Sequence, residues 1–541
     1  MLDLWYKNAV LYCVDVETYM DGNGDGVGDF RGLSQRLDHI AGLGATCVWL
    51  LPFYATPNRD NGYDVSDYYA VDPRLGTFGD FVEFTHLARE KGLRVIVDLV
   101  VNHSSTEHPW FKAACADKDS PFRDFYLWSE EKPADAHEGM VFPGVQHTTW
   151  TWNEQAGAHY FHRFYDHEAD LNMDNPAVRE EIERIMGFWL QLGVSGFRID
   201  AAPFVIETPV GPDKGKMHFE YIQEMRSVQQ WRRGDAVLLA EANVLPEEVG
   251  DYVGDGDGMH LMFNFITNQR LFLALARQDP KPLAEAIRSL PDMPEMAQWA
   301  NFVRNHDELD LGRLSEEERE ECFRLFAPDE HMRAYGRGIR RRLAPMLGND
   351  RRKLELVYSL MFTLSGTPVI WYGEEIGMGE NLELEERTAV RTPMQWSDGP
   401  NGGFSPVGKD KLVRPVNSGG EYGFETVNAE AQARDRDSLL TWFERAARMR
   451  RQCPEFGWGP TELLDLGNDK VLAHRCRWRG NSVAALHNFS PDKQAVSLEP
   501  LCEEGTRLVD LFEDKDYGRL QRTDRLELEG YGYVWLRVEG K

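Results

Sequence analysis

Short apolar runs alternate with longer segments of helical periodicity along the first 455 residues, which predicts strands alternating with helices. We predict strands over residues 10–16, 46–51, 93–101, 194–199, 237–240, 259–265, 299–303 and 367–372. We predict helices over residues 33–43, 78–91, 175–192, 353–364 and 439–451. Eight strands with intervening helices are typical of a (β/α)8 TIM barrel, which belongs to the α/β fold class.

Two stretches interrupt this alternation. Residues 104–169 are rich in Trp, His and Pro, and we interpret them as a small domain inserted after the third strand. Residues 308–352 form a highly charged insertion with helical character. This second insertion is either a solvated helix face or a cap over the active site, because insertions after strand seven lie on the catalytic face of a barrel.

Short β-rich runs replace the alternation after about residue 457, and the runs at residues 483–489 and 533–538 are strand candidates. They predict a separate, antiparallel β domain at the C-terminus. The expected division is therefore a barrel over residues 1–103 and 170–455, an inserted subdomain over residues 104–169, and a C-terminal β-sandwich over residues 456–541.

The composition narrows the range of partners. The formal net charge of −29 repels nucleic-acid phosphates and anionic lipids, so we expect neither nucleic acid nor a membrane as a partner, although solubility alone also accounts for such a charge. No apolar stretch is long enough to span a membrane, and residues 1–7 do not begin a signal peptide. The seven cysteines lack paired spacing, which indicates reduced thiols and a cytoplasmic protein.

Polar residues cluster where the predicted strands end, on the side of a barrel that carries the active site. Asp200 and Glu241 follow two successive strands, and a glycosidase requires such a pair of carboxylates. One carboxylate attacks or stabilises the sugar carbon, and the other protonates the departing oxygen. Arg198, two residues before Asp200, can keep that carboxylate ionised. The other polar residues at strand ends are Asp98, His103, His306 and Asp307.

Four segments match, in order, the motifs of the α-amylase-type glycoside hydrolases, and the chain resembles this retaining family over its whole length. The segments are residues 98–103, Gly-Phe-Arg-Ile-Asp at 196–200, Ala-Glu-Ala-Asn at 240–243 and Arg-Asn-His-Asp at 304–307. The resemblance implies that Asp200 is the nucleophile, that Glu241 is the general acid and then the base, and that Asp307 binds the sugar hydroxyls and helps to distort the ring. In a retaining enzyme, the carboxyl groups of Asp200 and Glu241 lie roughly 5–5.5 Å apart.

The same resemblance implies a set of residues that bind the glucosyl ring. Asp60 together with Arg391 would bind the 4-hydroxyl at a closed end of the pocket, and Tyr63 would stack under the sugar. The remaining residues implied are His103 and His306 as hydrogen-bond donors to the ring, Asp98 beside them, and Arg198, which would orient Asp200.

Residues 21–29 read Asp-Gly-Asn-Gly-Asp-Gly-Val-Gly-Asp and place oxygen atoms at alternate positions of a tight loop, which suits Ca²⁺. The loop is not an EF-hand, because its twelfth position is Gly32. The family resemblance implies a structural Ca²⁺ here, and a Gly–Asp turn without an ion is the alternative. The implied ligands are the side chains of Asp21, Asn23, Asp25 and Asp29 and the carbonyl oxygen of Val27.

Within the family, the likeness is greatest to the trehalose synthases, which interconvert maltose and trehalose. It is carried by residues 48–54, 240–243, 254–257, 338–345 and 391–396. The chain departs from that group at residues 244–245, 168–172 and 14–19, and we expect these departures near the acceptor sugar. Relatives that prefer α-1,6 linkages tend to carry Val directly after the nucleophile, so the resemblance implies that the smaller Ala201 favours α-1,4 or α-1,1 linkages.

The sequence leaves three hypotheses for the function. In the first, the chain is a glucosyltransferase or isomerase that acts on maltose or trehalose, a small α-linked sugar, through a glucosyl–Asp200 intermediate. In the second, it is an α-1,4-glucosidase that hydrolyses small α-glucosides. In the third, it is a silent binding or chaperone subunit, which the presence of the carboxylates and the lack of an anchor oppose. The likeness to trehalose synthases also suggests a homo-oligomer.

Overall fold

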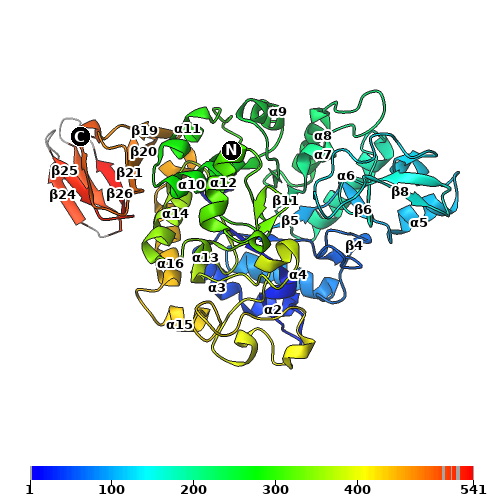
Figure 1. Cartoon of the computed structure of the whole chain (residues 1–541), viewed down its shortest axis with the longest axis horizontal. Coiled ribbons are helices and arrows are strands. Elements are labelled where there is room, and N and C mark those ends of the chain that lie inside the picture. Colours follow the sequence, from blue (N-terminus) through cyan, green and yellow to red (C-terminus); the bar gives the residue numbers. More distant parts are fainter. Residues whose placement is uncertain (1–2, 502–505, 513–514, 520–523, 540–541) are drawn as a thin grey trace.

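Eight parallel strands close into a barrel at the centre of the chain (Figure 1). The computed structural model describes residues 3–501, 506–512, 515–519 and 524–539. The last strand closes onto the first through the pairing of Leu11 with Val369. The predicted barrel is therefore confirmed. Its strands are β1 (Leu11–Val14), β2 (Cys47–Leu50), β5 (Arg94–Leu99), β11 (Gly196–Ile199), β12 (Val237–Ala240), β13 (Leu261–Phe263), β14 (Gln298–Phe302) and β18 (Thr367–Trp371).

The helices that the pattern predicted are present. They are α4 (Phe78–Glu90), α6 (Pro176–Gln191), α14 (Arg351–Thr363) and α16 (Leu439–Gln452), while the helix predicted over residues 33–43 is divided at Arg36 into α2 (Phe30–Gln35) and α3 (Leu37–Gly42). Local chemistry explains where they start: Thr77 and Asp80 form a capping box at the start of α4, and Asn175 caps α6 with a proline in its first turn.

The pattern missed helices between β11 and β14. They are α8 (Phe219–Arg232), α10 (Phe265–Arg277) and α11 (Lys281–Ser289). Helix α8 buries Arg226 and Gln229 beside its few apolar residues, so its hydrophobic stripe is weak. Helix α10 has an apolar stripe of helical period, but its first residue, Phe265, was included in the strand predicted over residues 259–265.

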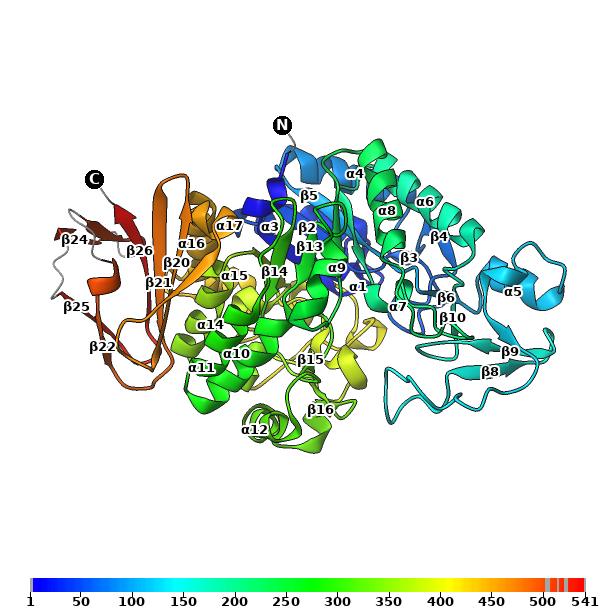
Figure 2. The same ribbon diagram turned by 90° about the horizontal axis from the view of Figure 1, so that it is seen from above.

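A small antiparallel unit follows the third barrel strand, at the opposite end of the molecule from the C-terminal sheet (Figure 2). Strand β6 (His103–Ser105) pairs with β10 (Glu168–Asp170), and between them lie α5 (Pro109–Ala116) and a sheet of β7 (Trp128–Ser129), β9 (Ala158–Phe161) and β8 (Trp150–Asn153). This unit lies where the insertion was expected, whereas its assigned limits, like the other domain boundaries, stay a prediction.

The insertion after β14 contains a short sheet and a charged helix. Strand β15 (Leu309–Asp310) pairs with β17 (Gly338–Ile339), which also pairs with β16 (Arg333–Ala334). Helix α12 (Glu316–Phe326) lies between β15 and β16 in the sequence, and Ser315 and Glu318 form a capping box at its start. Because β15 follows the last catalytic motif directly, this sheet is attached to the rim of the barrel.

The C-terminal region is antiparallel, as predicted. Its larger sheet, in the described part of the chain, has the order β19 (Thr461–Leu464), β20 (Val471–Trp478), β21 (Asn481–Asn488), β26 (Tyr533–Glu539), β23 (Arg507–Asp510) and β24 (Lys515–Arg519). A second sheet pairs β22 (Gln494–Ser497) with β25 (Arg525–Leu528). Side chains of both sheets share one apolar cluster, to which Leu486, Val496 and Leu536 belong.

Other sequence predictions have mixed outcomes. None of the helices in the described ranges has the length and apolar character needed to cross a bilayer. Six cysteines are buried and unpaired, namely Cys13, Cys47, Cys115, Cys322, Cys453 and Cys476, and Cys502 lies outside the described residues. The expected cytoplasmic location and homo-oligomer stay predictions.

The contact between α14 and the C-terminal sheet provides a test of the fold. The buried hydroxyl of Ser359 accepts a hydrogen bond from Trp535 Nε1 at 2.8 Å and lies 2.8 Å from His487 Nε2. We expect Ser359→Ala to lower the free energy of unfolding by about 1–3 kcal/mol, because it leaves a buried indole N–H without a partner. Ser482→Ala is the control, since the Ser482 hydroxyl makes no hydrogen bond among the described residues. Equal melting temperatures for the two variants would contradict this account.

Candidate active site

The carboxyl ends of the barrel strands surround one cavity of about 400 Å³. Asp98 and Arg198 lie near the ends of β5 and β11, and Asp200 and Glu241 directly follow β11 and β12. Asp307 lies beyond the end of β14. The predicted site residues that line the cavity are Asp60, Tyr63, His103, Asp200, Glu241 and Asp307.

The guanidinium of Arg198 joins the carboxyl groups that were predicted to be catalytic. Its Nη1 atom lies 3.0 Å from Asp98 Oδ2 and also hydrogen-bonds Asp200, and its Nη2 atom lies 2.7 Å from Glu241 Oε2. The Arg198 side chain is only 1% exposed. Asp200 and Glu241 therefore occupy neighbouring positions around one buried cation, and the carboxyl separation given above stays a prediction.

Burial gives Glu241 the protonation state of a general acid. Burial, together with the charges of Asp200 and Asp307, raises the pKa of Glu241 to about 8, against the opposing effect of Arg198. The backbone N–H of Ala201, a residue with a left-handed φ of 47°, donates to Glu241 Oε2 at 3.1 Å. At neutral pH, Glu241 thus holds a proton that it can give to a departing oxygen.

Tyr63 connects Asp98, near the end of β5, with His306, which follows β14. Its hydroxyl donates to Asp98 Oδ2 at 2.8 Å and lies 2.8 Å from His306 Nε2. The rings of Tyr63 and His306 are nearly parallel, with their centroids 6.0 Å apart. Burial raises the pKa of Asp98 to about 7 and lowers the pKa of His306 to about 4. The imidazole of His306 is therefore neutral at neutral pH.

His103 lies beside the same cavity on β6, where it is buried. Its Nε2 atom has no hydrogen-bond partner in the described part of the chain and lies 3.8 Å from Glu168 Oε1. Burial lowers the pKa of His103 and raises that of Glu168 well above its usual value. This leaves a buried polar atom of His103 available to a ligand.

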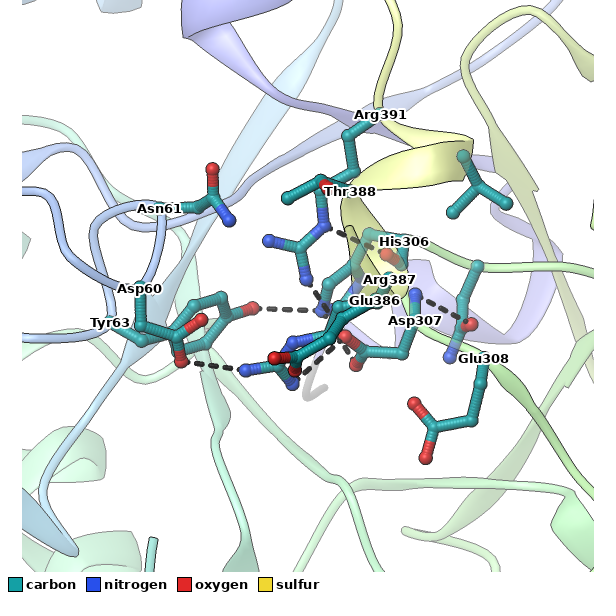
Figure 3. A network of polar contacts seen from close by, with 12 residues as sticks. Asp60, Asn61, Tyr63, His306, Asp307, Glu308, Glu386, Arg387, Thr388 and Arg391 are labelled. Atoms are coloured by element: carbon teal, nitrogen blue, oxygen red, sulfur yellow. Dashed lines mark hydrogen bonds and ion pairs between the residues drawn. The ribbon is translucent and has the colours of Figure 1, made fainter. Parts of the chain in front are cut away.

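The closed end of the cavity differs from the sequence expectation. Asp60 was expected to act with Arg391, but its partner is Arg387, whose Nη2 lies 2.6 Å from Asp60 Oδ2 (Figure 3). Arg387 Nη1 also lies 3.2 Å from Asp307 Oδ1. Arg391 is fully buried, where it donates to the His306 carbonyl oxygen at 2.8 Å and to Asp307 Oδ1 at 2.8 Å. Arg387 lines the cavity, and Arg391 supports Asp307 from behind.

These contacts control the charge of Asp307. Burial alone would raise the pKa of Asp307, but its contact with His306 Nε2 at 3.0 Å and the charges of Arg387 and Arg391 hold it well below its usual value. Asp307 is therefore ionised beside a largely protonated Glu241. Sequence reasoning missed Arg387 because it lies only four residues before Arg391 in an irregular segment, η6 (Glu386–Val390), and no periodicity there indicates which side chain faces the cavity.

Both insertions contribute to the roof of the cavity. Val141 and Phe142 come from the first insertion, and Glu308, Asp310 and Arg337 come from the second. The sequence allowed the second insertion to be either a cap over the site or a solvated helix face, and both descriptions fit. Strand β15 and the turn between β16 and β17 carry residues that line the cavity, while α12 has an exposed acidic face.

Two hydrogen bonds connect the insertions to Glu386, which precedes Arg387. The hydroxyls of Tyr165 and Tyr335, one from each insertion, both donate to Glu386 Oε2 (Figure 3 shows Glu386 beside Arg387). Sequence reasoning also missed these residues, since nothing in the local pattern brings three distant segments together.

The loop expected to bind Ca²⁺ is held by internal hydrogen bonds. Asp21 accepts bonds from the backbone N–H groups of Gly24 and Gly26 at 2.6 and 2.8 Å and from the Ser405 hydroxyl at 2.6 Å. Asp29 accepts a bond from Gly32 N–H at 2.7 Å. Nowhere in the described ranges do three His, Cys, Asp or Glu side chains form a metal cluster. These contacts fit the ion-free turn as well as an occupied loop, so the Ca²⁺ site stays a prediction.

Comparison with known proteins identifies the family. The alpha-amylase catalytic domain matches residues 15–327 and 340–459, and the C-terminal domain of sucrose hydrolase-like proteins matches residues 480–537. The chain belongs to the α-amylase family of glycoside hydrolases. It is a retaining enzyme that acts on α-glucosides.

Trehalose synthases are among the similar proteins. That of Thermus thermophilus is 42% identical over 99% of this chain, which spans 56% of the relative's length. That of Pimelobacter sp. is 39% identical over 99% of this chain and 96% of its own length. The crystal structure of the trehalulose synthase MutB from Pseudomonas mesoacidophila has a TM-score of 0.79 and 26% identity, with 99% of both chains covered.

The two arginines at the closed end should respond differently to substitution. We expect Arg387→Lys to raise KM for small α-glucosides about tenfold with little change in melting temperature, because an ammonium group cannot bridge Asp60 and Asp307 in the same geometry. We expect Arg391→Lys to lower the melting temperature by several degrees, because its buried bonds to His306 and Asp307 are lost. Steady-state kinetics and thermal melts of both variants test this, and the reverse pattern would restore Arg391 as the substrate-binding residue.

Proposed function

We propose that the enzyme transfers a glucosyl unit from maltose to a retained glucose and so forms trehalose, with the reverse reaction at the same site. The shape of the cavity carries this proposal, because one end is closed by the Asp60–Arg387–Asp307 contacts and residues of two insertions line its open side. A volume of about 400 Å³ suits a disaccharide better than a polymer. The full-length similarity to trehalose synthases supports the same substrate class.

In the proposed mechanism, Asp200 attacks the anomeric carbon while Glu241 protonates the glycosidic oxygen. The bond between carbon and departing oxygen breaks, and a covalent glucosyl–Asp200 intermediate remains. Glu241, now ionised, removes the proton from a hydroxyl of the acceptor as that oxygen displaces Asp200. Arg198 supports both steps, since its guanidinium contacts both carboxylates.

Hydrolysis is the second candidate, and one observation favours it. Val244 lines the cavity three residues after Glu241, on the side where we expect the acceptor to bind, and Leu245 follows it with 39% of its surface exposed. Neither side chain can hydrogen-bond an acceptor hydroxyl. A weakly held glucose would leave, and water would then receive the glucosyl unit, which is the reaction of an α-1,4-glucosidase.

Proton NMR of the enzyme incubated separately with maltose and with trehalose tests the proposal. We expect the anomeric signals of the second disaccharide to appear in each case, with little free glucose. Asp200→Ala should lower the turnover by several orders of magnitude, because no covalent intermediate can form. Glucose as the sole product would support the glucosidase instead, and near-normal activity of the Asp200→Ala variant would refute the assigned nucleophile.

The pH dependence provides a second test. Because the pKa of Glu241 is raised to about 8, the protonated acid is present at neutral pH and is lost as the pH rises through that value. We therefore expect kcat/KM for maltose to fall on the alkaline side near pH 8. A nitrophenyl α-glucoside needs little protonation of its leaving group, so its alkaline decline should be much weaker. Identical alkaline declines for both substrates would argue against Glu241 as the acid.

A further inference from the structure

Arg337 joins the two insertions at the roof of the cavity. Its Nη1 atom donates to the carbonyl oxygen of Val141, in the first insertion, at 2.8 Å. Its Nη2 and Nε atoms lie 3.3 Å from Glu308 Oε1 and 3.6 Å from Asp310 Oδ1. All four residues line the cavity. One guanidinium thus spans the space between the first insertion and the segment that follows Asp307.

The turn that carries Arg337 has a restricted conformation. Tyr335 and Gly336, between β16 and β17, have left-handed φ angles of 54° and 67°. A tyrosine is held in this region only where its surroundings constrain it. Here its hydroxyl donates to Glu386 at 2.6 Å, and its ring lies 4.8 Å from that of Phe142. These contacts place Arg337 in a defined position and not on a free loop.

Arg337 is also connected to the segment that carries the general acid. Asp310 Oδ2 accepts a hydrogen bond from Asn243 Nδ2 at 2.8 Å, and Asn243 follows Glu241 by two residues. Burial and the charge of Asp307 raise the pKa of Glu308 to about 7, and Arg337 opposes this rise. A change at Arg337 therefore reaches the segment that follows Glu241, while Arg337 itself makes no contact with Asp200, Asp60 or Arg387 among the described residues.

We propose that Arg337 determines whether the glucosyl unit passes to a sugar or to water. It does so by joining the two insertions above the acceptor sugar through its contacts with Val141, Glu308 and Asp310. The proposal rests on the transfer reaction proposed above. In both outcomes the bond between Asp200 and the anomeric carbon breaks, the acceptor oxygen forms the new bond, and its proton goes to Glu241. A retained sugar competes with water at a high effective concentration, which is lost when the roof opens.

The test compares Arg337→Met with Arg333→Met. Methionine keeps much of the side-chain volume but removes the guanidinium. Arg333 lies on the same hairpin, outside the cavity lining, where it donates to the Ala327 carbonyl oxygen at 3.0 Å and lies over the Phe323 ring. Each enzyme receives a nitrophenyl α-glucoside together with isotope-labelled glucose. Nitrophenol counts every glucosyl–enzyme formed, and the labelled disaccharide counts every transfer to sugar.

We expect wild type and Arg333→Met to transfer the same fraction of glucosyl units to labelled glucose, and Arg337→Met to transfer about fivefold less. The nitrophenyl group occupies the acceptor side before it leaves, so we express transfer per nitrophenol released, and a change in the rate of the first step does not alter this ratio. Arg337→Lys should give an intermediate fraction, since a lysine cannot hold one carbonyl and two carboxylates in the same geometry.

An unchanged transfer fraction in Arg337→Met would overturn the assignment, and so would a wild type that transfers nothing to labelled glucose. A parallel loss of nitrophenol release and transfer, with a lowered melting temperature, would show a merely structural role and would also overturn it. The maltose experiment separates this result from the proposed function. If wild type makes another disaccharide but no trehalose, the isomerase proposal fails, while the transfer fraction still decides the role of Arg337.

Discussion

The active site depends on one buried positive charge, the guanidinium of Arg198. It contacts Asp98, Asp200 and Glu241, so three carboxylates from three neighbouring strands share one cation. Burial alone would lower the pKa of Arg198, but these carboxylates hold it well above its usual value. Since an unpaired buried charge costs several kcal/mol, the cation and its partners require one another. The pairing of Arg198 with Asp98 across β11 and β5 supplies the register that this arrangement needs.

A second guanidinium repeats this arrangement at the closed end of the cavity. Arg387 lies between Asp60 and Asp307, two carboxylates that would otherwise repel each other in a buried setting. The first cluster is built on barrel strands, whereas Arg387 comes from an irregular segment fastened by Tyr165 and Tyr335 through Glu386. Chemistry and substrate size are thus assigned to different parts of the chain. The barrel holds the reacting carboxylates, and the loops limit what can reach them.

The parts of the site that sequence could predict are those that follow regular strands. Asp200 and Glu241 each come directly after a short apolar run, and a parallel barrel brings such positions to one rim. The choice between Arg387 and Arg391 could not be made in this way, because Arg387 lies in a five-residue 3-10 helix and Arg391 ends it, and so short a helix shows no period in the sequence. Helix α10 was missed for another reason: it begins at Phe265, directly where the strand predicted over residues 259–265 was expected to end.

The sequence by itself therefore determined the eight barrel strands, the α/β barrel and the identity of the carboxylates at its rim, because each follows from local periodicity and from residues adjacent to it. Only the tertiary structure decided which arginine meets Asp60, and that two insertions meet over the cavity through Arg337 and Val141. These contacts join residues separated by hundreds of positions. Their geometry depends on how irregular loops pack against one another, and no local pattern in the chain records it.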